Sequence, residues 1–374
     1  MNHTINHAFV HALLIVGLAT GCQSNKDEKT DDTASANNTS TTAATDTAQT
    51  TGSKPALLHS LPVQYNTPDG MALAPDGSVI VSVPNFGNPS YPAALLRMAN
   101  DTIGFFFAPP KHPDTKHAAP MDLAYGPDGN LYYADNQWQY SKERKSRLMR
   151  VRMQNGKPTT VETVVEGFRL ANAVLWKGDT IYVTDSQWDT PEKPRESAVL
   201  RFSLAELNRA PVKLKPGFTD PHILATFTTQ DNTSGLDNGA DGLDYDSKGN
   251  LYTGGFGDGI LYKMTLNPDG TLKQKTQFAK LACVDGLIVD RTTDRLFVCD
   301  SKNNAIRIIT PDGKISTLTE NADTNGQNGL LDQPAEVLLQ SNRLIVANYD
   351  MPEKAFKNQR FDAPHTLSVI QMRP

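Results

Sequence analysis

The sequence predicts an all-β fold, a six-bladed β-propeller with four-stranded blades, and two observations support this prediction. A short apolar strand that begins with a polar residue, or with one beside it, recurs six times at intervals of about fifty residues. This spacing is typical of one radially repeated β-fold rather than of several domains. Helical periodicity is scarce, and residues 204–209 form at most a turn or so of helix. We expect the recurring strands to be the innermost strands of six blades, at residues 69–73, 121–125, 172–176, 241–245, 285–289 and 335–339.

Each innermost strand is followed by a turn and a second strand rich in β-branched and aromatic residues. Pro-Asp-Gly makes the first two of these turns, at residues 75–77 and 127–129, because Pro presets φ and Gly accepts positive φ. The second strands are expected at residues 78–83, 130–134, 180–184, 250–253, 295–299 and 343–347. Third strands follow at residues 93–98, 146–151, 198–202, 259–264 and 305–309. Fourth strands lead into the next repeat at residues 102–107, 160–165, 223–228, 276–281 and 315–319.

The last repeat lacks an outer strand, because the chain ends after its third strand at residues 366–372. The segment at residues 57–63 precedes the first innermost strand and has nothing before it with which to pair. We therefore expect this segment to complete the sixth blade. Such a closure removes the open sheet edge that would otherwise promote aggregation.

The polar residues at the starts of the innermost strands point toward a shared axis in a propeller. A ring of carboxylates and an amide at that place indicates a metal or substrate site. Taken singly, Asp69, Asp122 or Asp285 has a simpler explanation, because Asp before Gly often bonds nearby backbone and channel carboxylates often hold only water.

Composition excludes several classes of function. The 374 residues carry 36 Lys and Arg against 41 Asp and Glu, a formal net charge of -5, and no basic stripe, so nucleic acid is not an expected partner. The densest basic run, residues 141–147, is short and is best explained as a solvated loop or strand edge. The chain contains no Gly-x-Ser-x-Gly, Cys-x-x-Cys, His-Glu-x-x-His or phosphate-binding loop, which leaves serine hydrolase, zinc and nucleotide functions without support.

The first 53 residues predict an export signal and a tether. Residues 1–22 resemble a bacterial lipoprotein signal peptide, with a short apolar stretch that ends in Leu-Ala-Thr-Gly-Cys and with Cys22 as the lipidated residue. Residues 23–53 are rich in Thr, Ser, Asn, Asp and Ala and predict a disordered tether. The propeller is expected at residues 54–374. By resemblance to such lipoproteins, Gln23 implies an outer-membrane anchor facing the periplasm; the alternative is an ordinary cleaved secretory signal.

Cys283 and Cys299 remain once Cys22 is assigned to lipidation. Both lie in the fifth repeat, on segments that a hairpin turn near residues 291–294 would bring side by side. A diagonal pair of this kind is marginally compatible with disulfide geometry, and an oxidising periplasm permits the bond. Two buried free thiols are an equal alternative.

The innermost strands, the Tyr-Val-Thr-Asp-Ser segment at residues 182–186 and the Pro-Asp-Gly turns together resemble the gluconolactonase and senescence-marker-protein family. The resemblance covers about residues 57–374, and paraoxonase and diisopropyl fluorophosphatase are more distant relatives. It implies one divalent cation in the channel, usually calcium, held by a Glu, an Asn and an Asp. Asn172 and Asp241 match the family's Asn and Asp, and Glu336 takes the place of the Glu in a circularly shifted ring. Met121 stands where the family often has a second Asn. Calcium, with magnesium or another divalent cation as the alternative, suits such oxygen ligands.

The resemblance also implies roles for residues around the cation. The cation would polarise a carbonyl or phosphoryl oxygen, and Asp241 would serve as base or nucleophile. Asp69, Asp122 and Asp285 are candidates for binding substrate, and Trp138 is a candidate wall for a sugar-like ligand. His117, with His112 nearby, is a candidate base at the channel entrance.

These residues lead to two hypotheses. The first is a monomeric, envelope-anchored and calcium-dependent hydrolase of a lactone or related ester, with a small sugar-derived molecule as substrate. The second is a non-catalytic propeller that binds a protein or small ligand, with any metal structural; Met121, and Ala173 after Asn172 in place of Gly, favour it.

Overall fold

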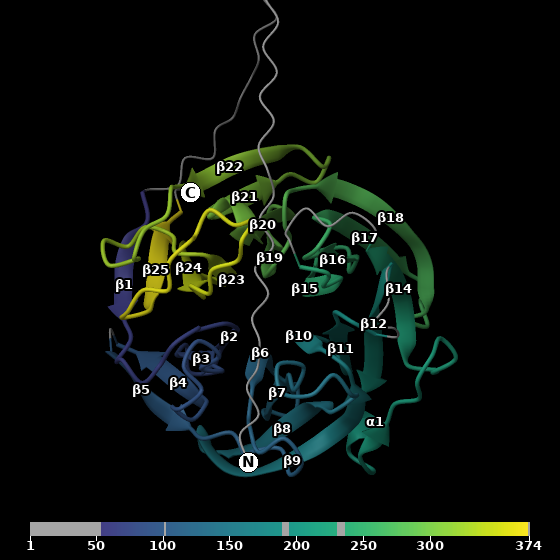
Figure 1. Ribbon diagram of the computed structural model, residues 1–374. Coiled ribbons are helices and arrows are strands. Elements are labelled where there is room, and N and C mark those ends of the chain that lie inside the picture. The colour runs from purple at the N-terminus through teal and green to yellow at the C-terminus, as the bar shows by residue number, and fades with distance from the viewer. Residues whose placement is uncertain (1–53, 101, 189–193, 230–235, 373–374) are drawn as a thin grey trace, which may run out of the picture. The chain divides into compact units, whose positions relative to one another are not determined.

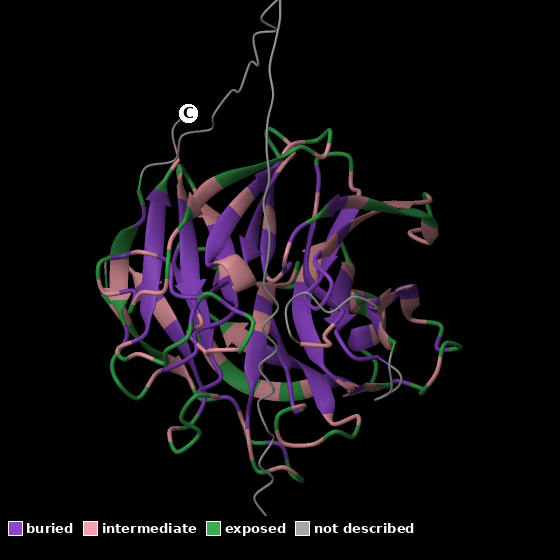
Figure 2. Cartoon of the chain, turned by 45° about the horizontal axis from the view of Figure 1, so that its top comes forward, coloured by how far each residue is buried: buried purple, intermediate pink, exposed green. Residues whose placement is uncertain are grey.

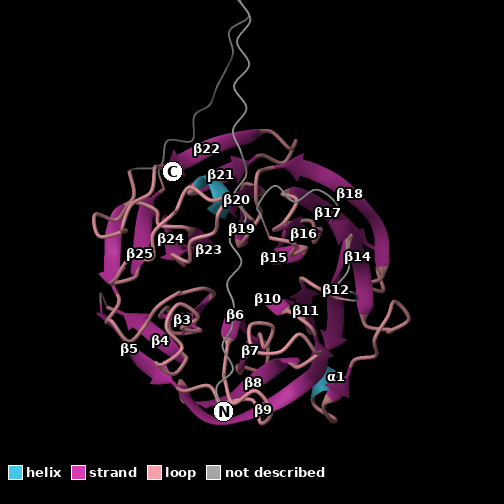
Figure 3. Cartoon of the chain, viewed as in Figure 1, coloured by secondary structure: helices cyan, strands magenta, loops and turns pink. Residues whose placement is uncertain are grey.

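The computed structural model describes residues 54–372, except residues 101, 189–193 and 230–235. In this part of the chain six antiparallel sheets are arranged around a central axis, as Figure 1 shows, which confirms the predicted six-bladed propeller. Helix is confined to one α-turn and one 3-10 turn, as Figure 3 shows. The predicted signal peptide and tether, with Cys22, lie outside the described residues. Among the described residues no helix is both long and apolar enough to cross a membrane.

Each blade runs from an innermost strand at the axis to an outer strand at the rim. Blade 1 contains β2 (Met71–Leu73), β3 (Val79–Val83), β4 (Ala94–Ala99) and β5 (Thr102–Phe107). Blade 2 contains β6 (Pro120–Tyr125), β7 (Leu131–Asp135), β8 (Ser146–Gln154) and β9 (Lys157–Phe168). Blade 3 contains β10 (Ala171–Lys177), β11 (Thr180–Asp185), β12 (Arg195–Ser203) and β14 (Ile223–Thr229), with helix α1 (Leu204–Leu207) between the last two.

The other three blades follow the same order. Blade 4 contains β15 (Ala240–Tyr245), β16 (Leu251–Gly255), β17 (Ile260–Leu266) and β18 (Leu272–Lys280). Blade 5 contains β19 (Leu287–Asp290), β20 (Arg295–Asp300), β21 (Ala305–Ile309) and β22 (Ile315–Glu320), with the 3-10 turn η1 (Ser301–Asn303) after β20. Blade 6 contains β23 (Pro334–Gln340), β24 (Arg343–Asn348), β25 (Thr366–Gln371) and β1 (Ala56–Ser60). Blade 2 alone adds a fifth strand, β13 (Val212–Lys213), parallel to β9.

The ring is closed by pairing the first strand of the described chain with the last. Strand β1 lies antiparallel to β25, with Ala56 opposite Val369 and Ser60 opposite Thr366. The amide of Leu61 continues the pairing by donating to the carbonyl of His365 at 2.7 Å. This arrangement confirms the predicted closure, and the observed strand ends three residues before the predicted end at residue 63.

The hydrophobic core lies between neighbouring blades rather than inside any one of them. The second strand of each blade is almost wholly buried, as Figure 2 shows, whereas outer strands such as β18 and β22 are largely exposed. The outer strand of blade 3, β14, is an exception and is mostly buried. Between blades 1 and 2, for example, Ile80 and Leu95 pack with Leu131 and Tyr133. Since each blade buries its faces only against its neighbours, the ring is stable only as a whole.

The Pro-Asp-Gly turns and the cysteines can be compared with their predictions. In the first turn Gly77 has φ +82°, and Asp76 accepts hydrogen bonds from the amide and hydroxyl of Ser78, as expected for a turn of this composition. Cys283 and Cys299 are buried free thiols, so the structure agrees with the second of the two alternatives. Burial raises the pKa of both thiols, which makes them unreactive in the folded protein.

Candidate active site in the central channel

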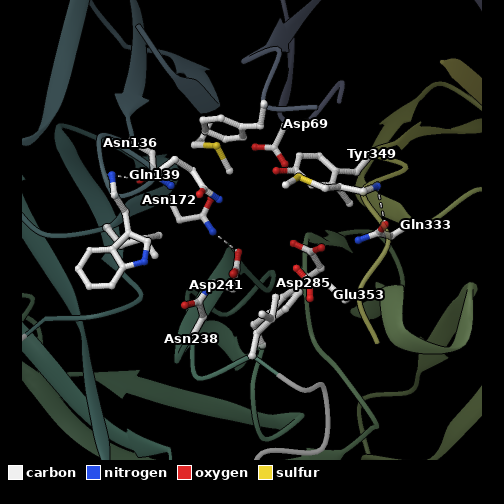
Figure 4. A pocket seen from close by; sticks show the side chains of 18 residues that line it. Asp69, Asn136, Gln139, Asn172, Asn238, Asp241, Asp285, Gln333, Tyr349 and Glu353 are labelled. Atoms are coloured by element: carbon white, nitrogen blue, oxygen red, sulfur yellow. Dashed lines mark hydrogen bonds between the residues drawn. The ribbon is translucent and has the colours of Figure 1, made fainter. Parts of the chain in front are cut away.

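The innermost strands present two successive rings of residues to the channel, which we name the upper and lower tiers. The upper tier lines a pocket of about 110 Å³ at the start of the strands, and Figure 4 shows this pocket from close by. The upper tier consists of Asp69, Met121, Asn172, Asp241, Asp285 and Ala335. The lower tier, one residue further along each strand, consists of Gly70, Asp122, Ala173, Gly242, Gly286 and Glu336.

Three of the four polar residues of the upper tier make side-chain hydrogen bonds. Asn172 Nδ2 donates to Asp241 Oδ1 at 2.6 Å, the bond drawn in Figure 4, and so connects blade 3 with blade 4. Ser301 Oγ donates to Asp285 Oδ2 at 2.9 Å from the start of η1. Asp69, Asn172 and Asp241 are at most 9% exposed. The structure therefore brings these four predicted site residues into one pocket, which the predicted Trp138 also lines.

The carboxyl groups of the upper tier are unusually easy to protonate. Burial raises the pKa of Asp285 to about 7. Burial first, and then the charges of Asp285 and Asp69, raises the pKa of Asp241 well above its usual range. Burial and Asp285 do the same for Asp69. No Lys, Arg or His is among the described residues that line the pocket, so these negative charges lack a counter-charge there.

The lower tier faces a second cavity. Asp122 and Glu336 line a space of about 220 Å³ that lies further along the strands and that the ion-paired Asp244 and Arg291 also line, together with apolar side chains. Asp122 accepts from the amides of Leu123 and Val174, both at 2.7 Å, and Glu336 Oε1 accepts from the amide of Val337 at 2.7 Å. Burial raises the pKa of Asp122 to about 8 and that of Glu336 well above its usual range.

The predicted cation ligands are thus divided between the two tiers. Asn172 and Asp241 lie together in the upper pocket, while Glu336 lies one residue beyond the upper-tier position, which Ala335 occupies. Asp122, a predicted substrate-binding residue, likewise stands one position below Met121. Asp69 and Asp285, which were expected to orient substrate, are the carboxylates that accompany Asn172 and Asp241.

His117 and Trp138 lie at the same end of the channel but in different settings. Trp138 lines the pocket, and Lys142 Nζ lies 4.1 Å and the Arg169 guanidinium carbon 5.3 Å from the centre of its ring. His117 is not among the residues that line the pocket; it stacks on Tyr140 with ring centres 3.9 Å apart. Trp138 therefore contacts the pocket directly, whereas the candidate base His117 does not.

The sequence prediction missed the residues that blade 6 contributes to the pocket. Gln333, before β23, and Tyr349, Met351 and Glu353, after β24, form one wall. The Tyr349 amide donates to the Gln333 carbonyl at 2.9 Å, and the Met351 amide donates to Gln333 Oε1 at 2.7 Å, which fixes the wall to the strand below it. The signal available in the sequence was the length of the connection between β24 and β25, which is the longest of its kind in the ring.

The donor set of the upper tier fits a hard cation. Asp69, Asp241 and Asp285 offer only oxygen, and a half-turn of the Asn172 amide would present its oxygen in place of its nitrogen. Oxygen donors with uncompensated negative charge suit calcium or magnesium. As the side chains stand, no three His, Cys, Asp or Glu groups within the described ranges are close enough together to hold a metal ion. Binding would therefore draw the carboxylates inward or include water.

Comparisons with known proteins agree with the fold. No protein-family model matches the chain, and no curated protein matches its sequence. A gluconolactonase from Xanthomonas campestris has 14% identity and a TM-score of 0.54, over 86% of this chain and 95% of its own. A luciferin-regenerating enzyme has 10% identity and a TM-score of 0.57, over 85% and 97%. The aldose sugar dehydrogenase of Streptomyces coelicolor, solved with PQQ bound, has 13% identity and a TM-score of 0.52, over 87% and 99%. At these identities the likeness shows the fold alone.

Proposed function

We propose that the chain hydrolyses a lactone or related ester, of the sugar-derived kind, in the upper pocket, with a divalent cation that is calcium by preference. The observation that carries the proposal is the convergence of the four polar upper-tier side chains on one pocket. Gluconolactonase among the structural neighbours supports the substrate class. The missing counter-charge in the pocket supports the cation.

The residues of the pocket have separate roles in this proposal. Asn172 and Asp241, with Asp69 or Asp285, would hold the cation, which when bound supplies a positive charge that polarises the substrate carbonyl. The Asp241 carboxylate takes a proton from the attacking water as the water oxygen bonds to the carbonyl carbon. When the ring carbon–oxygen bond breaks, the same proton passes to the leaving oxygen.

Calcium titration by calorimetry, followed by a lactone panel on the same samples, tests the proposal. Wild type is expected to bind calcium saturably and to hydrolyse at least one lactone, and Asp241→Ala is expected to lose both. Asp312→Asn is the matched control, because Asp312 is an exposed turn carboxylate on the outer part of blade 5. No binding at millimolar calcium, with no turnover of any lactone, would contradict the proposal.

A second candidate function is a non-catalytic propeller that binds a ligand or protein. The observation that favours it is that Met121 and Ala335 leave two of six upper-tier positions apolar. Calcium binding without turnover across the panel, and with Asp241→Ala still folded, is the outcome that would favour this candidate over hydrolysis.

The location of the protein is proposed from residues 1–53 alone. We propose lipidation at Cys22 and an anchor in the bacterial outer membrane, with the propeller in the periplasm. Metabolic labelling with a palmitate analogue is expected to label wild type and to leave Cys22→Ser unlabelled. Labelling that persists in the variant would contradict the lipid anchor.

A further inference from the structure

Glu353 is a carboxylate on the pocket wall that the proposed hydrolysis does not use. Its backbone is held in place, because its carbonyl accepts from the Phe356 amide at 2.9 Å and from Gln359 Nε2 at 3.1 Å. Its side chain is partly buried and makes no hydrogen bond or ion pair to another described residue. Burial raises the pKa of this carboxyl group. A carboxylate that lines a pocket without a partner in the described chain is available to bind a group from outside the chain.

The charge of the pocket selects among ligands. The described residues that line it include four carboxyl groups, Asp69, Asp241, Asp285 and Glu353, and no Lys, Arg or His. When these groups are ionised, a bound divalent cation would offset two of their negative charges and leave the others. Two basic side chains, Lys142 and Arg169, lie over the ring of Trp138. Neither of them is among the residues that line the pocket. A carboxylate or phosphate on the ligand would meet repulsion over most of the pocket.

The surroundings of Glu353 suit an ammonium group in particular. Glu353 and Tyr349 both line the pocket, and the charge of Glu353 adds to the effects of burial, Asp69, Asp285 and Tyr140, which raise the pKa of the Tyr349 phenol. Figure 4 shows Glu353, Tyr349 and Gln333 on one side of the pocket, across from Asn136 and Gln139. A carboxylate and an aromatic side chain that line the same partly desolvated pocket form a setting that favours a bound ammonium over a neutral group.

We propose that Glu353, with the ring of Tyr349, binds an ammonium group of the ligand, so that the pocket takes amine-bearing sugars and lactones in preference to neutral ones and rejects anionic ones. The inference rests on the proposed function, in that it treats the upper pocket as the substrate site. It goes further, because it names the charge of the substrate and the residue that binds the charged group.

Binding of three sugars of similar size tests the inference without any need for turnover. Calorimetry on the full chain, with calcium present, compares glucosamine, glucose and glucuronate. Glucosamine is expected to bind about tenfold more tightly than glucose, as one charge-assisted contact provides, and glucuronate is expected not to bind. Glu353→Gln is expected to bind glucosamine no better than glucose. Glu143→Gln, in an exposed connection of blade 2 outside the pocket, is expected to behave as wild type.

An activity measurement separates failure of this inference from failure of the proposed function. At pH 6, kcat/KM is compared for γ-butyrolactone and its α-amino derivative. A preference for the amine that Glu353→Gln removes supports the inference. Equal turnover of both lactones, or a preference unchanged in Glu353→Gln, would overturn the inference and leave the hydrolase proposal intact. Absence of turnover together with selective glucosamine binding would overturn the hydrolase proposal and leave the ammonium site.

Discussion

The upper and lower tiers of the channel lie one residue apart on the same strands, yet their carboxylates are held differently. In the lower tier Asp122 and Glu336 accept hydrogen bonds from backbone amides, and Asp122 thereby connects blade 2 to the Val174 amide of blade 3. In the upper tier Asp241 and Asp285 accept from side chains, Asn172 and Ser301, and face a polar pocket. Backbone donors are part of the fold, whereas side-chain donors can turn toward a ligand.

Backbone packing also differs between the tiers, and it too assigns the lower tier to the fold. Three lower-tier positions are Gly, and at all three the chain at the start of the next blade passes too close for a side chain. A Cβ on Gly242 would lie 2.4 Å from the carbonyl oxygen of Asp285, and one on Gly286 would lie 2.4 Å from that of Ala335. No upper-tier position is Gly, and the polar side chains there face the pocket. The comparison indicates that the lower tier holds the blades together and that the upper tier is free to bind.

The largest effect that this comparison predicts is on stability. Gly242→Ala places a methyl group against the backbone of blade 5, and we expect a loss of about 3 kcal/mol in the free energy of unfolding. Urea denaturation followed by fluorescence measures it. Gly104→Ala, in strand β5, is the control, because a Cβ there meets nothing within 4 Å. If Gly242→Ala is as stable as the control, the blades do not approach each other in this way.

The next effect separates the two tiers by function. Asp122→Ala leaves the amides of Leu123 and Val174 without their acceptor, and we expect a loss of about 2 kcal/mol in stability with calcium affinity unchanged. Asp285→Asn keeps an acceptor for Ser301 and removes a buried charge, so stability is expected to hold or rise. Calcium affinity of Asp285→Asn is expected to fall at least tenfold.

Calorimetry on the two variants measures calcium affinity, and urea denaturation of the same variants measures stability. The opposite pattern, in which Asp122→Ala loses calcium and Asp285→Asn unfolds, would exchange the roles of the tiers. A loss of calcium binding in both variants would show that the channel acts as one site.

The fold could be predicted from the sequence because its signals repeat. Innermost strands that begin with or beside a polar residue recur at regular spacing and define the blades. An unpaired segment before the first of these strands implies the closure that β1 and β25 form. Strand ends were harder to predict, as β1 ends at Ser60 rather than at residue 63. Hydrophobic patterns specify that a strand exists more strongly than where it stops.

The site could be predicted only in part, for two physical reasons. Adjacent residues on a strand face different ways, and the pairing of β23 with β24 is irregular between Pro334 and Glu336, so polarity alone did not reveal that Ala335 rather than Glu336 faces the pocket. Tyr349 and Glu353 lie in a long connection without periodicity. Their positions depend on the contacts of Gln333, which become visible only in three dimensions.

The smallest effect concerns the pH dependence of stability in the lower tier. Asp122 has a pKa of about 8 in the folded chain against 3.8 ordinarily, with burial as the main cause. Between these values the folded state holds a proton that the unfolded state has lost, so stability decreases as pH rises from 4 to 8. Asp122→Asn removes this titration. From pH 5 to pH 8 the free energy of unfolding of Asp122→Asn is expected to fall less steeply than that of wild type. The two slopes are expected to differ by about 1 kcal/mol per pH unit. This difference is somewhat below the limit for one proton, because the Asp122 side chain keeps some exposure to the cavity.

Urea midpoints at four pH values, measured without calcium, determine the two slopes. The remaining slope of the variant is expected from the other carboxyl groups with raised pKa values, including Asp285 at about 7 and Asp332 at about 8. Identical slopes for wild type and Asp122→Asn would mean that Asp122 is ionised in the folded protein at neutral pH. In that case hydrogen bonds from the amides of Leu123 and Val174 lower the pKa of Asp122 by more than burial raises it. The lower tier then carries a negative charge next to the carboxyl groups of the upper tier.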